Sequence, residues 1–216
     1  MMSWGEEPYI VKEAIPFVAV FASLTLLAAA SRFGSLFWVL LLATLCVTAF
    51  FRNPHRSVPA DPKAILCPAD GKILEVESVS SPDLIPVPSR KISIFMSPLD
   101  VHVNRVPASG TVKRKAHRPG KFYVASLPKA STKNERVELV IETPDGFNLG
   151  VIQIAGRMAR RIVCYPGEGD PVEKGKRFGL IRFGSRVELF LPQEVSVAVR
   201  PGQHVKGGET VMGYFP

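Results

Sequence analysis

The sequence predicts a mostly β domain, residues 52–216, behind an N-terminal helical hairpin, residues 14–51, that is embedded in a membrane. The hairpin is predicted from an apolar block of 38 residues in which Arg32 is the only charged residue. The β domain is predicted from short alternating runs that proline and glycine separate after residue 52. A chain of 216 residues has room for one such domain beside a membrane segment.

The apolar block divides in its middle, at the sequence SRFGS of residues 31–35. Residues 14–30 and 36–51 then make two helices of 17 and 16 residues. At 1.5 Å per residue each helix reaches about 25 Å, slightly less than the hydrocarbon core of about 30 Å. Two arrangements fit, namely two short transmembrane helices with both ends in the cytoplasm, or a hairpin that dips into one leaflet. A buried hairpin of a soluble protein fits less well, because neither half has a polar face.

The net charge of +8 is concentrated in the β domain. Residues 1–13, an N-terminal tail, contribute −2 and Arg32 contributes +1, so residues 52–216 carry +9. A basic domain behind an apolar anchor favours anionic lipid headgroups as the partner over nucleic acid. Arg52 and Arg56 directly follow the block and predict that the β domain lies on the cytoplasmic side of the cell membrane.

The β domain is expected to be a sandwich or barrel of short strands. The alternating runs are residues 91–95, 137–142, 151–154, 187–191 and 195–199, with turn signals at Asp70-Gly71, Asp145-Gly146, Pro201-Gly202 and Gly207-Gly208. The basic run of residues 113–118 is expected to be a solvated loop. Residues 69–73 and 108–112 repeat a small turn followed by a strand, which is similar to the barrel-sandwich hybrid of lipoyl-type domains; chance repetition is the alternative.

Gly184-Ser185 enters one of these predicted strands. Glycine permits a distorted peptide geometry, and a serine after it can attack the preceding carbonyl and shift the acyl group from nitrogen to oxygen. Elimination of that ester breaks the chain and leaves an N-terminal pyruvoyl group. The same pair occurs at Gly34-Ser35 in the apolar block, and a turn is the simpler explanation of either pair.

Two carboxylates and a histidine are candidates for acid–base chemistry. Asp70 precedes Gly71 and is first of all a turn residue. Asp100 and His102 are two residues apart, so in a strand they face the same side. A carboxylate there can hold the imidazole in one tautomer and raise its basicity. The alternative is a surface pair without a catalytic task.

Cysteine and arginine placement adds two expectations. Cys46, Cys67 and Cys164 lie far apart without a CxxC motif, so neither a disulfide scaffold nor a structural zinc site is expected. Arg160 and Arg161 flank an apolar run and can clamp a phosphate, although a solvated face is the commoner role.

Taken together, the motifs resemble one family, the short bacterial or archaeal form of the phosphatidylserine decarboxylase proenzyme. The matching pieces run in order along nearly the whole chain: FFRNP at 50–54, PADG at 68–71, SPLDVH at 97–102, PASG at 107–110, NER at 134–136, ARRIV at 159–163 and RFGSR at 182–186.

The resemblance implies a chain that cuts itself between Gly184 and Ser185. Residues 1–184 become the β chain, residues 185–216 become the α chain, and the two form a heterodimer. Ser185 becomes the covalent pyruvoyl cofactor, and Asp70, a histidine and Ser185 act as a triad in the cleavage. The pyruvoyl group takes the amine of phosphatidylserine as a Schiff base, carbon dioxide leaves, and phosphatidylethanolamine is released. A homo-oligomer is also possible in this family.

The sequence departs from the family at one position. Longer members have a second histidine three residues after the first, whereas Arg105 stands there in this chain. His102 then serves both self-cleavage and protonation, or another group takes one task. Arg160, Arg161 and Lys129 are candidates for binding the phosphate and carboxylate of the substrate, and the chemistry calls for no metal.

Two other functions remain open from the sequence. One is a pyruvoyl decarboxylase that acts on a soluble amino acid, which the apolar block disfavours. The other is a non-catalytic, membrane-tethered adaptor similar to a lipoyl domain. That adaptor predicts a lysine in a Met-Lys-Met or similar hairpin tip, and the sequence has none.

Overall fold

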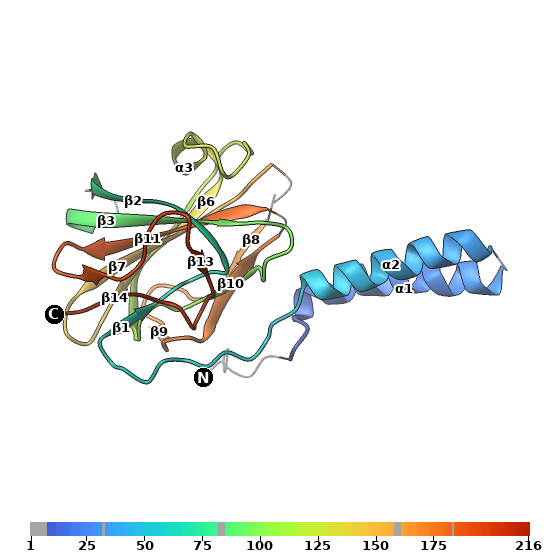
Figure 1. Ribbon diagram of the computed structural model, residues 1–216, viewed down its shortest axis with the longest axis horizontal. Helices are drawn as coiled ribbons and strands as arrows, with labels where there is room; N and C mark the ends of the chain where they lie inside the picture. The colour runs from blue at the N-terminus through green and yellow to red at the C-terminus, as the bar shows by residue number, and fades with distance from the viewer. Residues whose placement is uncertain (1–7, 32, 82–84, 158–160, 183) are drawn as a thin grey trace. The chain divides into compact units, whose positions relative to one another are not determined.

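The computed structural model describes the chain except residues 1–7, 32, 82–84, 158–160 and 183. The chain divides into two compact units, residues 1–55 and residues 56–216 (Figure 1). The first unit contains the predicted apolar helices, and the second contains the predicted β domain.

The first unit is a helical hairpin. Its elements are η1 Lys12–Ala14, α1 Ile15–Ala30 and α2 Gly34–Phe50. The hydroxyls of Thr25 and Thr44 lie 3.0 Å apart between the two helices, and each also donates to a carbonyl of its own helix. Residues 12–30 form a helix of 19 residues that is long and apolar enough to cross a membrane by length and composition, and α2 is a shorter apolar helix. The predicted pair of apolar helices is therefore confirmed, while their depth in a membrane stays a prediction.

The second unit is built from antiparallel strands, which confirms the mostly β prediction (Figure 1). The strands are β1 Ala64–Leu66, β2 Gly71–Ser81, β3 Ile85–Met96, β4 Val103–Arg105, β5 Gly110–Arg118, β6 Arg136–Glu142, β7 Asn148–Ile154, β8 Ile162–Cys164, β9 Pro171–Val172, β10 Arg177–Ile181, β11 Ser185–Pro192, β12 Ser196–Val197, β13 His204–Val205 and β14 Val211–Tyr214. One short helix, α3 Ala130–Lys133, interrupts them.

Eight strands form one curled sheet in the order β13-β2-β3-β11-β7-β6-β5-β9. Two smaller sheets, β1-β14-β12 and β4-β10-β8, complete the domain. Strand β11 lies near the middle of the large sheet, between β3 and β7, and all of its residues are buried. The sheet therefore holds the residue that begins β11, Ser185, in the interior of the domain.

Two local predictions differ from the structure. Residues 195–199 contain only the two-residue strand β12. The prediction of a solvated loop at residues 113–118 is wrong, because these residues lie in β5 and pair with β6. Strand β9 covers β5 only at residues 110 and 111, so the basic side chains occupy a sheet edge that faces solvent.

The side chains of β11 are buried on both faces of the sheet, and one of these faces carries charged as well as apolar side chains. Phe190 packs on one face with Ile85, Val140, Ile152 and Ile154. The same face carries Arg186 and Glu188, which are 1% and 2% exposed.

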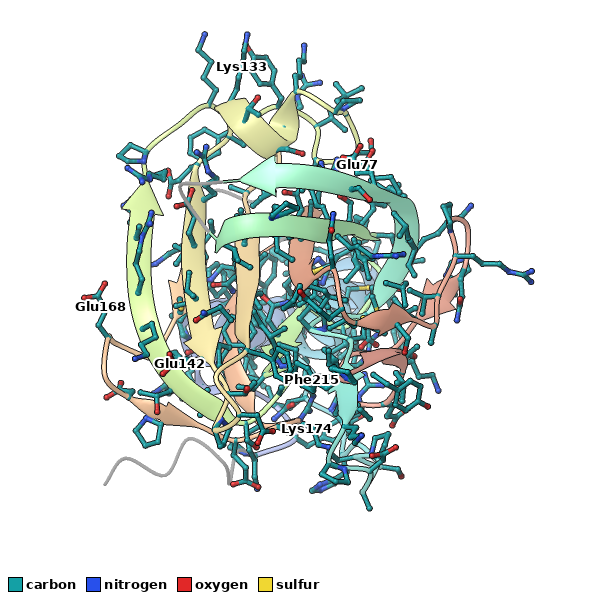
Figure 2. All side chains as sticks on the ribbon, turned by 90° about the vertical axis from the view of Figure 1, so that its left-hand side faces the viewer. Glu77, Lys133, Glu142, Glu168, Lys174 and Phe215 are labelled. Atoms are coloured by element: carbon teal, nitrogen blue, oxygen red, sulfur yellow. The ribbon has the colours of Figure 1, made fainter. Side chains whose placement is uncertain are left out.

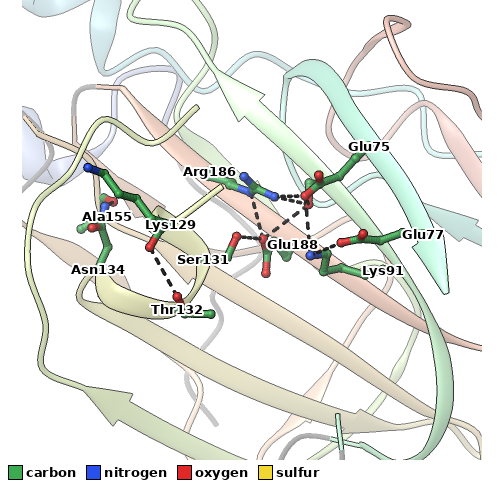
Figure 3. A network of polar contacts seen from close by, with 11 residues as sticks. Glu75, Glu77, Lys91, Lys129, Ser131, Thr132, Asn134, Ala155, Arg186 and Glu188 are labelled. Carbon is green, nitrogen blue, oxygen red and sulfur yellow. Dashed lines mark hydrogen bonds and ion pairs between the residues drawn. The ribbon is translucent and has the colours of Figure 1, made fainter. Parts of the chain in front are cut away.

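These two buried charges belong to a polar network (Figure 3). The Nε of Arg186 lies 2.9 Å from the Oε1 of Glu188, and its Nη2 pairs with Glu75 on β2. Ser131 of α3 donates to the same Glu188 oxygen at 2.6 Å. Since buried charges are stable only when they are paired, the network fixes the start of β11 against β2 and against the segment that holds α3.

Candidate active site

The reactive peptide predicted from sequence lies where a loop enters the large sheet. Ser185 is the first residue of β11, is fully buried, and faces Met96 as its partner on β3. Its hydroxyl donates to the Met96 sulfur at 3.3 Å. A thioether is a weak acceptor, so this contact holds the hydroxyl loosely.

Gly184 supplies an unusual backbone conformation directly before the serine. Its φ is +63°, in the left-handed region that side chains other than that of glycine rarely adopt. A Cβ added to Gly184 would meet nothing within 4 Å, so the backbone angle, and not a lack of space, requires glycine here.

His102 is the side chain that reaches this peptide. The ring is only 2% exposed, and its Nε2 accepts a hydrogen bond from the main-chain N–H of Gly184 at 3.2 Å. Its Nδ1 lies 2.9 Å from the main-chain oxygen of Asp100. An N–H donor at Nε2 and a carbonyl at Nδ1 together assign the neutral tautomer with its proton on Nδ1. The lone pair of Nε2 therefore accepts the Gly184 N–H, one peptide unit before the Gly184–Ser185 bond, and the ring is in the neutral form that a general base requires.

The expected strand around Asp100 and His102 is not present. Residues 97–100 form a turn, and β4 begins only at Val103. The Asp100 carboxylate accepts the N–H of Ser97 at 2.7 Å, which closes this turn. The prediction that the two side chains lie on the same side of a strand is thus wrong, and the Asp100 contact that orients the ring comes from its main chain.

Asp70 lies in a different set of contacts. Its carboxylate pairs with Arg56 at 2.7 Å and accepts the N–H of Gly207 at 2.8 Å. Burial raises the pKa of the Asp70 carboxyl, the Arg56 guanidinium opposes that rise, and the charge of Asp100 adds to it. The structure therefore brings His102 to Gly184, the residue before Ser185, and it holds Asp70 in an ion pair within electrostatic reach of Asp100.

Arg105 does not take over the role of a second histidine. Its guanidinium donates to the main-chain oxygen of Gly175 at 3.0 Å. Burial, and after it the charge of Arg56, lowers the pKa of Arg105 to about 10. A group with this pKa keeps its proton at neutral pH, so Arg105 cannot accept one from Ser185.

Two cysteines are excluded as alternative nucleophiles. Burial raises the pKa of the Cys67 and Cys164 thiols to about 12. Since the thiolate is the reactive form, both are inert at neutral pH.

Among the residues that the structure describes, no group of three His, Cys, Asp or Glu side chains could hold a metal ion.

The predicted substrate-binding residues are exposed where they are described. Arg161 is exposed, and its main-chain oxygen accepts the N–H of Arg182, two residues before Gly184, at 3.3 Å. Lys129 is exposed, with its Nζ 4.3 Å from the centre of the Tyr123 ring. Arg160 lies outside the described residues.

Gly156 is a site residue that the sequence analysis missed. It follows β7, and a Cβ built on it would overlap the carbonyl oxygen of Gly184 and lie 3.3 Å from the Cβ of Ala125. The carbonyl that Ser185 would attack therefore rests against the bare backbone of Gly156. The sequence signal is weak, because a small residue after an apolar strand usually marks a turn.

Gly156→Ala is expected to slow self-cleavage by about 100-fold, the cost of misplacing a reacting group by roughly 1 Å. The new methyl group must displace the Gly184 carbonyl, while Ser185 and His102 remain unchanged. The measurement is the fraction of cut chain against time on a denaturing gel, taken on protein with a normal thermal unfolding transition.

Gly167→Ala is the matched control. Gly167 has an ordinary φ, and a Cβ there would make only a 3.5 Å contact with Asp170. This variant should cut itself at the rate of the unchanged chain. If folded Gly156→Ala cut itself at that same rate, the role of Gly156 in placing the Gly184 carbonyl would be contradicted.

Comparisons with known proteins agree with these motifs. Residues 43–213 match a family model described as phosphatidylserine decarboxylase. A protein of Syntrophus aciditrophicus (strain SB) is 45% identical over 212 residues, which is 97% of this chain and 99% of that protein. A protein of Pelobacter propionicus is 46% identical, covering 94% of this chain and 96% of that protein. One of Geobacter sulfurreducens is 44% identical, covering 98% and 99%. All three are named phosphatidylserine decarboxylase proenzyme.

Proposed function

The chain belongs to the phosphatidylserine decarboxylase family, and we propose that it performs this reaction with a pyruvoyl group made from its own Ser185. The reaction converts phosphatidylserine to phosphatidylethanolamine and carbon dioxide in phospholipid synthesis. One observation carries the proposal: the neutral imidazole of His102 accepts the main-chain N–H of Gly184 through Nε2 at 3.2 Å, and Gly184 directly precedes the buried Ser185 in the chain.

The first step of self-cleavage joins the chain through an ester. Nε2 of His102 first releases the Gly184 N–H. The hydroxyl of Ser185 then leaves Met96, gives its proton to Nε2, and bonds to the carbonyl carbon of Gly184. The carbon–nitrogen bond then breaks, and the Ser185 nitrogen leaves as an amine with the proton that His102 returns. The left-handed φ of Gly184 and the bare backbone of Gly156 support this step, because both keep the carbonyl accessible to the serine.

The second step is an elimination. The Cα proton of Ser185 is removed and its Cβ–O bond breaks, which releases the Gly184 carboxylate as the end of the β chain. The remaining dehydroalanine rearranges to an imine, one water replaces its nitrogen, and ammonia leaves. The balance is one water consumed and one ammonia released, with no oxidant.

The residues around Ser185 fit a pyruvoyl group. Once formed, that group supplies a ketone beside an amide carbonyl, which bonds the substrate amine and accepts the electron pair left by carbon dioxide. His102 is proposed to return a proton to the substrate carbon. Arg161, Lys129 and Arg160 are proposed to bind the phosphate and carboxylate of phosphatidylserine.

Asp70 is proposed to assist His102 through its charge. Its side chain is 14% exposed, and its negative charge interacts with that of Asp100, whose main-chain oxygen binds Nδ1 of His102. A negative charge near this hydrogen bond stabilises the imidazolium that forms when His102 takes the serine proton.

The two chains are proposed to stay together as a heterodimer after cleavage. Residues 185–216 supply β11, β12, β13 and β14, and β11 lies between β3 and β7 of the other chain. The ion pair of the buried Arg186 with the partly exposed Glu75 adds a link between the future chains. Removal of β11 would expose two strand edges inside the large sheet.

The helical hairpin is proposed to hold the enzyme in the cell membrane, with residues 52–216 in the cytoplasm. The length and composition of the 12–30 helix support a membrane location, and the basic residues after the hairpin support the cytoplasmic side. The hydroxyls of Thr25 and Thr44 each donate to a carbonyl of their own helix, which lowers the cost of placing them in hydrocarbon.

The proposal is tested by intact-mass measurement of the denatured protein. We expect residues 1–184 and a 32-residue fragment, 185–216, that is lighter by one ammonia than a peptide with a free serine N-terminus. Hydroxylamine, which traps carbonyl groups, should abolish turnover of phosphatidylserine. An active protein with an uncut chain would contradict the mechanism, and turnover of free aspartate alone would assign a soluble substrate.

A further inference from the structure

The segment between β5 and β6 presents a lysine-rich, apolar surface. This 119–134 loop contains Lys121, Lys129 and Lys133 and no acidic residue, so its net charge is +3. All three lysines are exposed. Val124 and Leu127 are each 41% exposed, so the same loop also presents two aliphatic side chains to solvent. Elsewhere on β5 and β6, basic side chains such as Lys113 pair with carboxylates.

The base of the loop is fixed, so this surface is a defined part of the fold. The N–H of Lys121 donates to the Lys133 oxygen at 2.7 Å, which closes the loop. The side-chain amide of Asn134 donates to the main-chain oxygens of Tyr123 and Ala155 at 2.9 and 2.8 Å. Ser131 adds its hydrogen bond to the buried Glu188 (Figure 3). The exposed side chains are therefore held outward by ordered backbone.

The inner side of the same loop reaches the reactive peptide. Ala125 is buried and lies against Gly156, whose backbone contacts the Gly184 carbonyl. The loop thus forms part of the wall of the active site on one side and an apolar, cationic surface on the other. A substrate that remains in a bilayer has to enter a site whose rim meets the bilayer.

We propose that the 119–134 loop is a lipid-contact surface, in which Val124 and Leu127 enter an anionic bilayer while Lys121 and Lys133 bind its headgroups. The inference rests on the proposed function, since it takes the substrate to be a membrane lipid. The positive charge favours anionic lipid as the partner, because lysines are attracted to the negative surface of such a bilayer. Exposed aliphatic side chains are stabilised when they enter the interface of the bilayer. The contact is separate from the helical hairpin, because it belongs to the β domain alone.

The test uses the full chain reconstituted in vesicles of phosphatidylcholine and phosphatidylglycerol. In a Cys46→Ser, Cys164→Ser background, Leu127→Cys carries an environment-sensitive fluorophore, and Lys174→Cys carries the same fluorophore as control. Figure 2 shows Lys133, which belongs to the loop, and Lys174 at opposite ends of the β domain. Lipids with a spin label near the headgroup should quench the probe at position 127 several-fold more than the probe at position 174. Equal quenching at the two positions would overturn the proposal.

A second measurement separates this inference from the proposed function. The double variant Lys121→Gln, Lys133→Gln should lower kcat/KM for phosphatidylserine in anionic vesicles by about 30-fold, as expected for the loss of two lysines near the surface. Turnover of short-chain phosphatidylserine dispersed as monomers should not change. The control pair Lys63→Gln, Lys174→Gln removes the same charge from elsewhere and should leave both activities unchanged.

Each other outcome has one meaning. An equal loss on vesicles and on monomeric substrate would assign the two lysines to the substrate pocket and overturn the lipid-contact role. Loss of a dimer in the double variant, without quenching at position 127, would assign the loop to a contact between two copies of the chain. Absence of turnover on any phosphatidylserine, with strong quenching at position 127, would contradict the proposed function and retain the lipid contact.

Discussion

Ser185→Ala is expected to leave a continuous chain of 216 residues that does not decarboxylate phosphatidylserine. A methyl group cannot attack the carbonyl of Gly184, so neither the ester nor the ketone can form, and turnover should fall to the uncatalysed rate. The fold should persist, because the hydroxyl donates to the weak acceptor Met96 and the loss of this hydrogen bond costs about 1 kcal/mol or less. A denaturing gel and a carbon dioxide release assay measure the two effects.

The chain contains a matched control for this substitution. Gly34-Ser35 repeats the dipeptide at the start of α2, where Ser35 is helical. Ser35→Ala should be cut and active like the unchanged protein. Decarboxylation by Ser185→Ala, or loss of cleavage in Ser35→Ala, would refute the assignment of the reactive serine.

Ser185→Cys gives a sharper test of the two-step chemistry. A thiol can accept the acyl group from nitrogen, and elimination then breaks the Cβ–S bond. The α chain should be the same pyruvoyl peptide, formed at a different rate, while the β chain should end in a thioacid at Gly184. The mass of the β chain reports this sulfur directly. A β chain with an ordinary carboxylate and an α chain with free cysteine would indicate hydrolysis in place of elimination.

The sequence predicted the features that local pattern determines. Alternating residue types located β3, β6, β7 and β11, because successive side chains of a strand point to opposite faces of the sheet. Charge and hydropathy located the helical hairpin. The basic run in β5 was wrongly predicted to be a loop. A strand near a sheet edge can carry charges on both faces, and here the carboxylates of Glu138 and Glu142 on β6 pair with basic side chains of β5.

The parts of the site that depend on contacts between distant segments could not be predicted. Gly156 matters only because β7 ends where the Gly184 carbonyl arrives, 28 residues later in the chain. The partner of Asp70 is Arg56, which the sequence marked only as a residue next to the apolar block. His102 was identified by its motif, but the main-chain contact from Asp100 depends on a turn that i and i+2 spacing does not reveal.

His102→Ala is expected to slow self-cleavage by about 100-fold to 10,000-fold, the usual contribution of a positioned general base. The substitution removes the Nε2 lone pair directed at Gly184 and leaves Ser185 intact. Because it also removes a buried ring, loss of cleavage alone would not separate chemistry from packing. His204→Ala, which changes an exposed histidine, is the control and should cut normally.

Added imidazole makes the distinction, since a small base can enter the space left by the ring and take the serine proton, whereas a packing defect gains no base from it. Imidazole should therefore restore a substantial part of the cleavage in folded His102→Ala, and the restored rate should rise with imidazole concentration. The role of His102 in protonating the substrate carbon is then measured as the rate of turnover per pyruvoyl group. The number of pyruvoyl groups is counted by their capture with hydroxylamine. If His102 also protonates the substrate carbon, each pyruvoyl group in the rescued protein turns over slowly once imidazole is removed. A variant that cuts itself at the normal rate and fails only in turnover would restrict His102 to protonation, and Ser185 would then need a different base.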